Sequence, residues 1–187
     1  MFDWLESFEK LKDLLGDFLS PFDKILVLGC GNANFSEDMY DAGYKKQWNI
    51  DISRVVIEQM RQRNRSRKYM LYEVMDCCDL KYPDNFFDII IDKSTIDAIL
   101  CGDNAYVNTA LMMKESQRVL KEDGGRYVAI SYGTPDNRSF HFTRKFLSWK
   151  LTTHSLTPDE QTKESEKKEV GNYVYVCEKR PDWREVY

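Results

Sequence analysis

The chain has 187 residues, a formal net charge of −4 and an ordinary apolar content of 42%. This length suits one domain with a substantial core, and no apolar run approaches the roughly 20 residues of a membrane span. The negative charge argues against nonspecific nucleic-acid binding, and the acidic first ten positions exclude a secretory signal. We therefore expect a single monomeric domain over residues 1–187, with no membrane partner and no specific nucleic-acid partner.

The five cysteines occur at irregular spacings, which is typical of free thiols in a reducing compartment. Cys77 and Cys78 are neighbours and are poorly placed to pair with each other. We therefore expect a cytoplasmic protein. No combination of these cysteines with His141 or His154 has the spacing of a zinc site, so no metal is expected.

The first expected element is a helix over 2–19, because its apolar residues recur at helical spacing and Ser20-Pro21 follows. We expect it to pack on the core at the sheet edge. A β-α-β unit comes next, with strands at 25–28 and 47–50 and a helix at 36–44. The run Ile25 to Leu28 is continuously apolar, as in a strand buried on both faces.

The rest of the chain alternates in the same way. We expect strands at 69–74, 86–91, 126–130, 151–156 and 173–177, with helices at 53–64, 106–120 and 139–147. The segment 157–169 is almost wholly polar, and we expect a mobile loop there. The pattern predicts an α/β fold with a seven-stranded, Rossmann-like, doubly wound sheet, mostly parallel with an antiparallel last strand.

The turn Gly29-Cys30-Gly31 follows the first strand, and Asp51 closes the second. Glycines let a backbone approach a ligand, and a carboxylate accepts hydrogen bonds from ribose hydroxyls. A dinucleotide site would need a third glycine at the helix start, where this chain has Asn34. The pattern therefore favours S-adenosylmethionine over a dinucleotide.

Four consecutive strands are expected to end at one edge, in Gly29, Asp51, Asp76 and Asp92. Ligands of open α/β sheets bind at that edge. Each aspartate alone could simply cap the element that follows it. Three carboxylates and a glycine turn together favour a ligand site.

The motifs of this chain resemble those of class I S-adenosylmethionine-dependent methyltransferases. Within that class they are similar to the eukaryotic group that includes the lysine methyltransferases of elongation factor 1-alpha. The run D-K-S-T-I-D-A at 92–98 is the specific one. The other matching pieces lie at 2–8, 27–36, 49–53, 75–76, 82–88, 118–127 and 131–135.

The resemblance implies a role for each site residue. It implies that Gly29 and Gly31 line the methionine moiety and that Asp51 holds the ribose. It further implies that Ile52 packs beside the adenine, that Asp76 and Cys77 border it, and that Trp4 and Lys93 flank the cofactor on the catalytic side. Trp4 would otherwise be read as a buried helix residue. Its aromatic face can attract a sulfonium group.

Methylation of a protein lysine is the expected activity, with a translation factor as one possible acceptor. Catalytic candidates are Asp92, Lys93 and Asp97, with Tyr132 nearby. The carboxylates of Asp92 and Asp97 could orient the ammonium group of the acceptor lysine before that group loses a proton to water. Asp97 could equally be an exposed cap of a helix following Thr95. A small-molecule methyltransferase and a non-catalytic cofactor-binding or partner-binding module remain the alternatives.

The chain departs from the family pattern at three places. The family carries a Tyr-Trp-x-x-Arg-Tyr segment before Phe2-Asp3-Trp4, whereas this sequence starts at Met1. We expect this form to bind the cofactor more weakly than an extended one, because one pocket wall would be open to water. Val27 replaces an acidic residue of many class I enzymes, and Ser94 replaces a glycine.

Overall fold

The structure is a computed structural model that describes residues 5–156 and 172–180. Its sheet has seven strands in the order β3-β2-β1-β4-β5-β7-β6. Strands β1 to β5 run parallel, and β7 is antiparallel to both of its neighbours, β5 and β6. The expected seven-stranded sheet with an antiparallel last strand is confirmed. The strands are β1 (Ile25–Leu28), β2 (Gln47–Asp51), β3 (Met70–Val74), β4 (Ile89–Lys93), β5 (Arg126–Ser131), β6 (Trp149–Leu156) and β7 (Asn172–Lys179).

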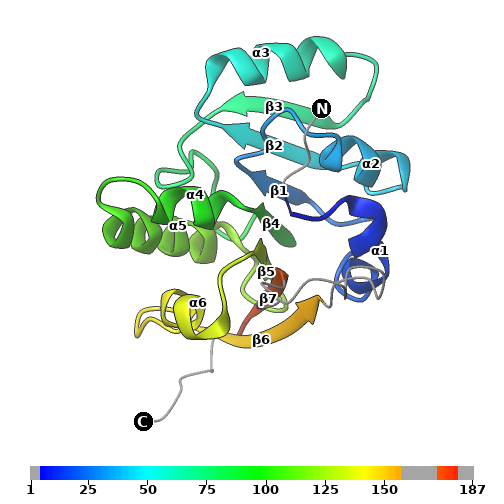
Figure 1. The fold of residues 1–187 in the computed structure, drawn as a ribbon. Helices are drawn as coiled ribbons and strands as arrows, with labels where there is room; N and C mark the ends of the chain where they lie inside the picture. Colours follow the sequence, from blue (N-terminus) through cyan, green and yellow to red (C-terminus); the bar gives the residue numbers. More distant parts are fainter. Residues whose placement is uncertain (1–4, 157–171, 181–187) are drawn as a thin grey trace, which may run out of the picture.

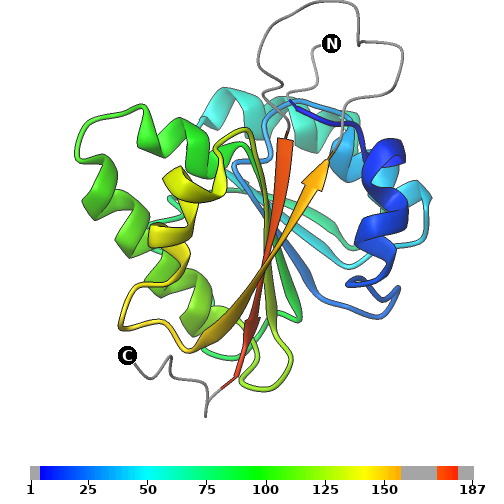
Figure 2. The same cartoon turned by 60° about the horizontal axis from the view of Figure 1, so that its bottom comes forward.

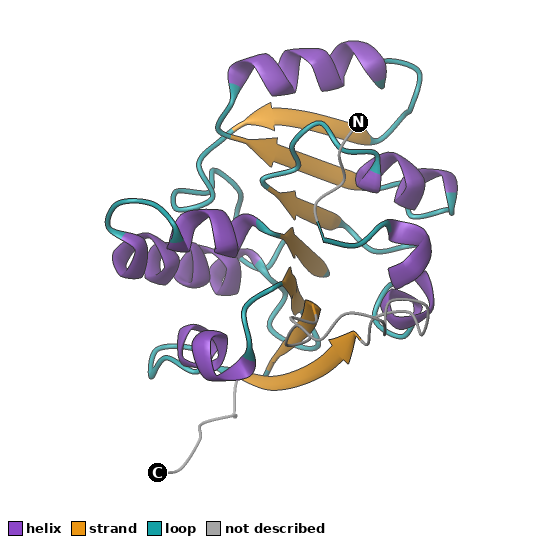
Figure 3. Ribbon diagram, in the orientation of Figure 1, coloured by secondary structure: helices purple, strands orange, loops and turns teal. Residues whose placement is uncertain are grey.

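Helices cover both faces of the sheet (Figures 1, 2 and 3). One face carries α1 (Phe8–Gly16), α2 (Phe35–Asp41) and α3 (Arg54–Arg63). The other carries α4 (Thr95–Leu100), α5 (Ala105–Val119) and α6 (Pro135–Phe142). No helix among the described residues is long and apolar enough to cross a membrane.

The two cores follow from the alternation of side chains along buried strands. Ile25 and Val27 of β1 pack in the core beneath α1 and α2, whereas Leu26 and Leu28 pack in the core beneath α4 to α6. Successive side chains of a strand point to opposite faces, so a strand covered on both faces must be apolar throughout. All four of these side chains are buried.

Several element boundaries differ from the sequence prediction. The helix expected over 2–19 begins at Phe8, because Leu5 has a left-handed φ of +64° that a helix cannot contain, and it ends at Gly16, a poor helix former. The strand expected over 86–91 begins at Ile89, because the amides of Phe86 and Phe87 bond to the Val119 carbonyl instead. The helix expected over 139–147 runs from Pro135 to Phe142, since proline suits a first helical turn. Two other predictions, Trp4 and the 157–169 loop, lie outside the described residues.

Candidate active site

The carboxyl ends of β1 to β4 meet where the strand order reverses, because the chain builds β1, β2 and β3 outward and then places β4 on the other side of β1. Open α/β sheets bind ligands at this point. The glycine turn follows β1, Asp51 ends β2, Asp76 follows β3, and Lys93 ends β4.

The two glycines of the turn are required for different reasons. Both have a φ of +55°, which side chains other than glycine rarely adopt. A Cβ on Gly29 would lie 2.4 Å from the Thr95 hydroxyl, which itself donates to the Leu28 carbonyl at 2.8 Å. A Cβ on Gly31 would meet no protein atom within 4 Å. Gly29 thus allows α4 to pack closely, whereas Gly31 borders open space.

Asp51 ties the glycine turn to the end of β2. Its carboxylate accepts hydrogen bonds from the Gly31 amide at 3.0 Å and from the Ser53 amide at 2.8 Å. Each carboxylate oxygen keeps lone pairs for a further donor. The next side chain, Ile52, is 75% exposed although it is large and apolar. A half-buried carboxylate, an exposed apolar side chain and the open space at Gly31 suit a nucleoside with an amino-acid tail.

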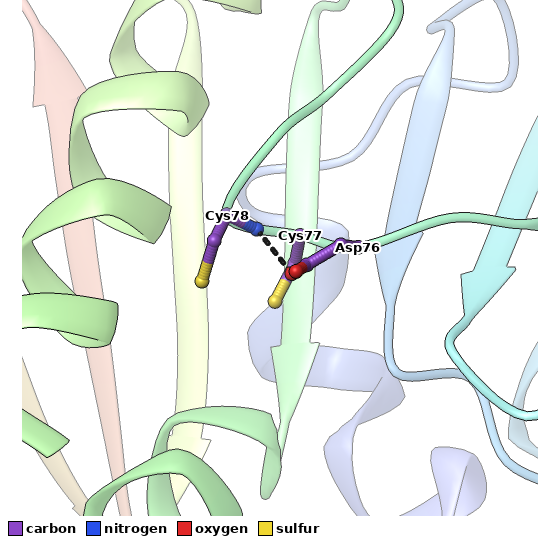
Figure 4. A group of neighbouring side chains, drawn as sticks. All are labelled: Asp76, Cys77 and Cys78. Carbon is purple, nitrogen blue, oxygen red and sulfur yellow. Dashed lines mark hydrogen bonds between the residues drawn. The ribbon is translucent and has the colours of Figure 1, made fainter. Parts of the chain in front are cut away.

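Asp76, Cys77 and Cys78 lie just after β3 (Figure 4). The Cys78 amide donates to the exposed Asp76 carboxylate at 2.8 Å. Cys77 is buried, and Cys78 is half-buried, with its sulfur 3.3 Å from the Asn108 carbonyl of α5. The hydrogen bond between the two thiols raises the pKa of Cys77 and lowers that of Cys78, and burial raises the pKa of Cys77 further.

Lys93 ends β4 and is half-buried. Its ammonium lies 5.4 Å from the centre of the Phe35 ring at the start of α2. A cation over an aromatic face is attracted to it, and this contact holds the charge beside the start of α2. Lys93 therefore supplies a positive group at the switch point between β1 and β4.

Asp92 is completely buried and surrounded by donors. Its carboxylate accepts from the Thr95 amide at 2.8 Å, from the Ile96 amide at 3.1 Å and from the Tyr127 hydroxyl. Burial raises the pKa of Asp92 to about 6 despite these hydrogen bonds. The carboxylate faces the start of α4 and presents no surface to a ligand.

Asp97 belongs to a second buried polar cluster, between β5 and α6. One of its oxygens, Oδ1, accepts from Arg138 at 2.7 Å and from Ser131 at 2.5 Å, and only 3% of the residue is exposed. Its other oxygen, Oδ2, is buried without a hydrogen-bond partner among the described residues. Gly133 makes room for this cluster, because a Cβ there would lie 2.3 Å from the Arg138 guanidinium. Asp97 is therefore a buried ion-pair residue, and the exposed cap expected as its alternative role is wrong.

The structure brings most of the predicted site residues to one edge of the sheet. Their binding and catalytic roles remain predictions. Sequence reasoning did not single out four residues that shape this edge. Thr95, Tyr127 and Ser131 lie within the matching motifs, and Arg138 lies outside them. Nothing in the sequence marks Tyr127 as the partner of Asp92, or Arg138 as the partner of Asp97. Only the fold brings those side chains to Asp92 and Asp97.

Comparison with known proteins agrees with this geometry. Residues 19–178 match the family described as Methyltransferase domain. The chain is 38% identical over 161 residues to the eEF1A lysine and N-terminal methyltransferase of Mus musculus, covering 83% of this chain. It is 32% identical over 158 residues to EEF1A lysine methyltransferase 4 of Bos taurus, covering 80% of this chain and 62% of that protein. The chain spans only 23% of the length of the mouse relative.

Solved structures share the fold at low sequence identity. A SAM-dependent methyltransferase from Methanosarcina mazei superposes with a TM-score of 0.67 at 16% identity, covering 89% of this chain and 97% of that one. The PH0226 protein of Pyrococcus horikoshii gives a TM-score of 0.68 at 18% identity, covering 92% and 89%. These matches confirm the Rossmann-like fold.

Burial of Asp92 predicts an unusual pH dependence of stability. Its pKa of about 6 in the folded protein exceeds its usual value of about 4, so the folded state holds this proton more tightly. Stability should therefore fall as the pH rises from about 4 to about 6, by on the order of 3 kcal/mol. Asp92→Asn should remove this fall, which denaturant unfolding at several pH values would measure.

Asp41→Asn is the matched control. Arg67 lowers the pKa of the exposed Asp41 carboxyl, so its small contribution has the opposite sign and is lost as the pH falls. If Asp92→Asn and the unmodified chain had parallel pH profiles, the buried carboxylate would not titrate in this range.

Proposed function

Because this chain belongs to the methyltransferase domain family, we propose that it transfers a methyl group from S-adenosylmethionine to a lysine of a protein acceptor. The observation that carries the proposal is the constellation at the switch point, where Gly31 borders open space, Asp51 offers a carboxylate and Ile52 is exposed.

The residues of this edge fit the parts of the cofactor in order. We assign the ribose hydroxyls to Asp51 and one face of the adenine to Ile52, with Asp76 and Cys77 at the adenine rim. Gly31 leaves room for the methionine moiety. The Lys93 ammonium, near the same turn, is suited to its carboxylate. Cofactor binding by these residues explains why an apolar side chain as large as Ile52 stays exposed.

When bound, the cofactor would supply the methyl group on a sulfonium, from which the neutral thioether is a good leaving group. What the protein must supply is alignment, and holding two reactants in a reactive geometry can lower a barrier by roughly 7–11 kcal/mol. The acceptor amine must arrive neutral, although a free lysine has a pKa of about 10.4. We place acceptor alignment and loss of that proton at the carboxyl ends of β4 and β5, next to Lys93 and Tyr132.

Asp92 and Asp97 fit the role of positioning residues better than that of proton acceptors. Asp92 fixes the start of α4, and Asp97 fixes Arg138 and the end of β5. Neither carboxylate reaches the surface. Tyr132, 43% exposed just after β5, can meet an acceptor directly, and the Arg138 guanidinium lies 5.5 Å from the centre of its ring.

A protein acceptor is the proposal that the relatives support. The mouse and bovine relatives are named for methylation of eEF1A, and the first name includes its N-terminus as well as lysine. We propose a lysine of eEF1A as the first acceptor to test.

All five cysteines are free, which supports a cytoplasmic location. We further propose that the chain is a monomer and that residues 1–187 form a single methyltransferase domain.

Asp51→Asn should weaken S-adenosylmethionine binding by roughly 1.5–3 kcal/mol, the scale of a hydrogen bond to a charged group. The amide keeps the size of the side chain but loses the charge and half of the acceptor capacity. Calorimetric titration would measure the change. Asp103→Asn, on the loop before α5, should bind as the unmodified chain does. Equal affinity of all three proteins would remove Asp51 from the site.

Gly31→Ala should abolish most cofactor binding, because its Cβ would occupy the open space of the site. Gly124→Ala is a close control, since Gly124 also has a positive φ, +72°, and open space around it, but lies before β5 at the opposite end of the sheet. Both variants should lose stability by roughly 1–2 kcal/mol through backbone strain. Only Gly31→Ala should lose affinity; similar affinity losses in both would mean that strain alone explains them.

Labelled S-adenosylmethionine should transfer its methyl group to purified eEF1A, and mass spectrometry should place the label on lysine. Label at the N-terminus alone would refute the lysine assignment. Label found only in the small-molecule fraction of a lysate would favour a small-molecule methyltransferase. Cofactor binding with no transfer to any fraction would favour a non-catalytic module.

A further inference from the structure

Three potential ligand atoms converge at the end of β3, from Asp76, Cys77 and Cys78. One atom of each side chain lies within 4.8 Å of the other two. In Figure 4 both sulfur atoms lie on the same side of the chain, with the Asp76 carboxylate beside the Cys77 sulfur. The cluster was not expected from the sequence, because consecutive residues do not have the spacing of a zinc motif.

We propose that Asp76, Cys77 and Cys78 bind a thiophilic divalent cation, of the Zn²⁺ and Cd²⁺ class, in competition with the nucleoside end of the cofactor. The competition rests on the proposed function; the cation site does not. Two sulfurs and one oxygen are a soft donor set, which favours these ions over Mg²⁺ or Ca²⁺.

The distances allow the cation to bind with little movement. Bonds of about 2.3 Å from a tetrahedral zinc ion place two ligand sulfurs about 3.8 Å apart. The atoms already lie within 4.8 Å of one another, so the side chains need to close by about 1 Å at most. On binding, each cysteine exchanges its S–H bond for a sulfur–metal bond, and the two protons pass to water.

The surroundings also favour a metal site. The Cys78 amide donates to one Asp76 oxygen, which orients the carboxylate and leaves the other oxygen for the ion. Asp76 is exposed and Cys78 half-buried, so an ion can enter from solvent, whereas Cys77 is anchored in the core. Water can complete the coordination. Since Asp76 and Cys77 are also the residues assigned to the adenine rim, the ion and the cofactor would exclude each other.

Cd²⁺ titration of the reduced, full-length chain tests the site, since sulfur–cadmium bonds absorb in the ultraviolet in proportion to their number. We expect one ion per chain with the absorbance of two bonds. Cys78→Ser should halve that absorbance and weaken binding on the order of ten-fold or more. Asp76→Asn should weaken binding without changing the absorbance. Cys101→Ser, which removes an exposed thiol outside the cluster, should change neither.

Two results would overturn the cation site: no sulfur–cadmium absorbance in the unmodified chain, or a Cys78→Ser variant, folded by circular dichroism, that titrates as the unmodified chain does. S-adenosylhomocysteine tests the competition separately and should raise the apparent Cd²⁺ dissociation constant. If Cd²⁺ binds through two sulfurs and the nucleoside has no effect, the cation site stands and the adenine placement falls.

Discussion

The junction between β4 and α4 is the contact on which the site depends. Asp92, buried at the end of β4, accepts the first free amides of α4 and the Tyr127 hydroxyl of β5. Helix starts leave such amides without partners, and a carboxylate is the side chain that satisfies them best. With α4 held there, Thr95 can donate to the Leu28 carbonyl, and its side chain fills the space that a Cβ on Gly29 would need. One side of the glycine turn is therefore packed against an element that lies more than sixty residues away in the chain.

The same junction holds an unfavourable backbone conformation. Ser94, between Lys93 and Thr95, has a φ of +66°, and its hydroxyl oxygen is buried without a hydrogen-bond partner among the described residues. Left-handed backbone costs a residue such as serine roughly 1–2 kcal/mol. The amide of Ser94 bonds to the Ile130 carbonyl at 3.0 Å, which ties this strained turn to β5. Strain at such a position persists because the surrounding contacts determine it, and here those contacts are the ones that place Lys93 and α4.

The contacts within the proposed nucleoside half of the site could be predicted from the sequence because they are local. Asp51 bonds to the amide of Ser53 two residues on, and to Gly31 of the neighbouring strand end, so a β-α-β pattern is enough to bring these groups together. The half at β4 and β5 could not be predicted in this way. Asp97 meets Arg138 across forty-one positions, and Asp92 meets Tyr127 across thirty-five. The spacing of residues in the sequence does not reveal such pairs. The sequence therefore offers Asp92 and Asp97 as carboxylates that orient an acceptor ammonium, although both are buried.

The difference between local and long-range contacts affects which substitutions each half of the site can tolerate. The cofactor half rests on backbone amides and glycine conformations, which tolerate few substitutions but depend on few partners. The other half rests on a buried ion pair, and removing one partner of such a pair leaves an uncompensated charge, whereas changing both together is far less costly. Arg138 lies on α6 and Asp97 on α4, so the pair fixes the distance between the two helices that flank Tyr132. The proposed acceptor surface can therefore be reshaped by exchanging the pair as a unit, while the glycine turn and Asp51 stay as they are. A fold organised in this way can keep one methyl donor and take different acceptors.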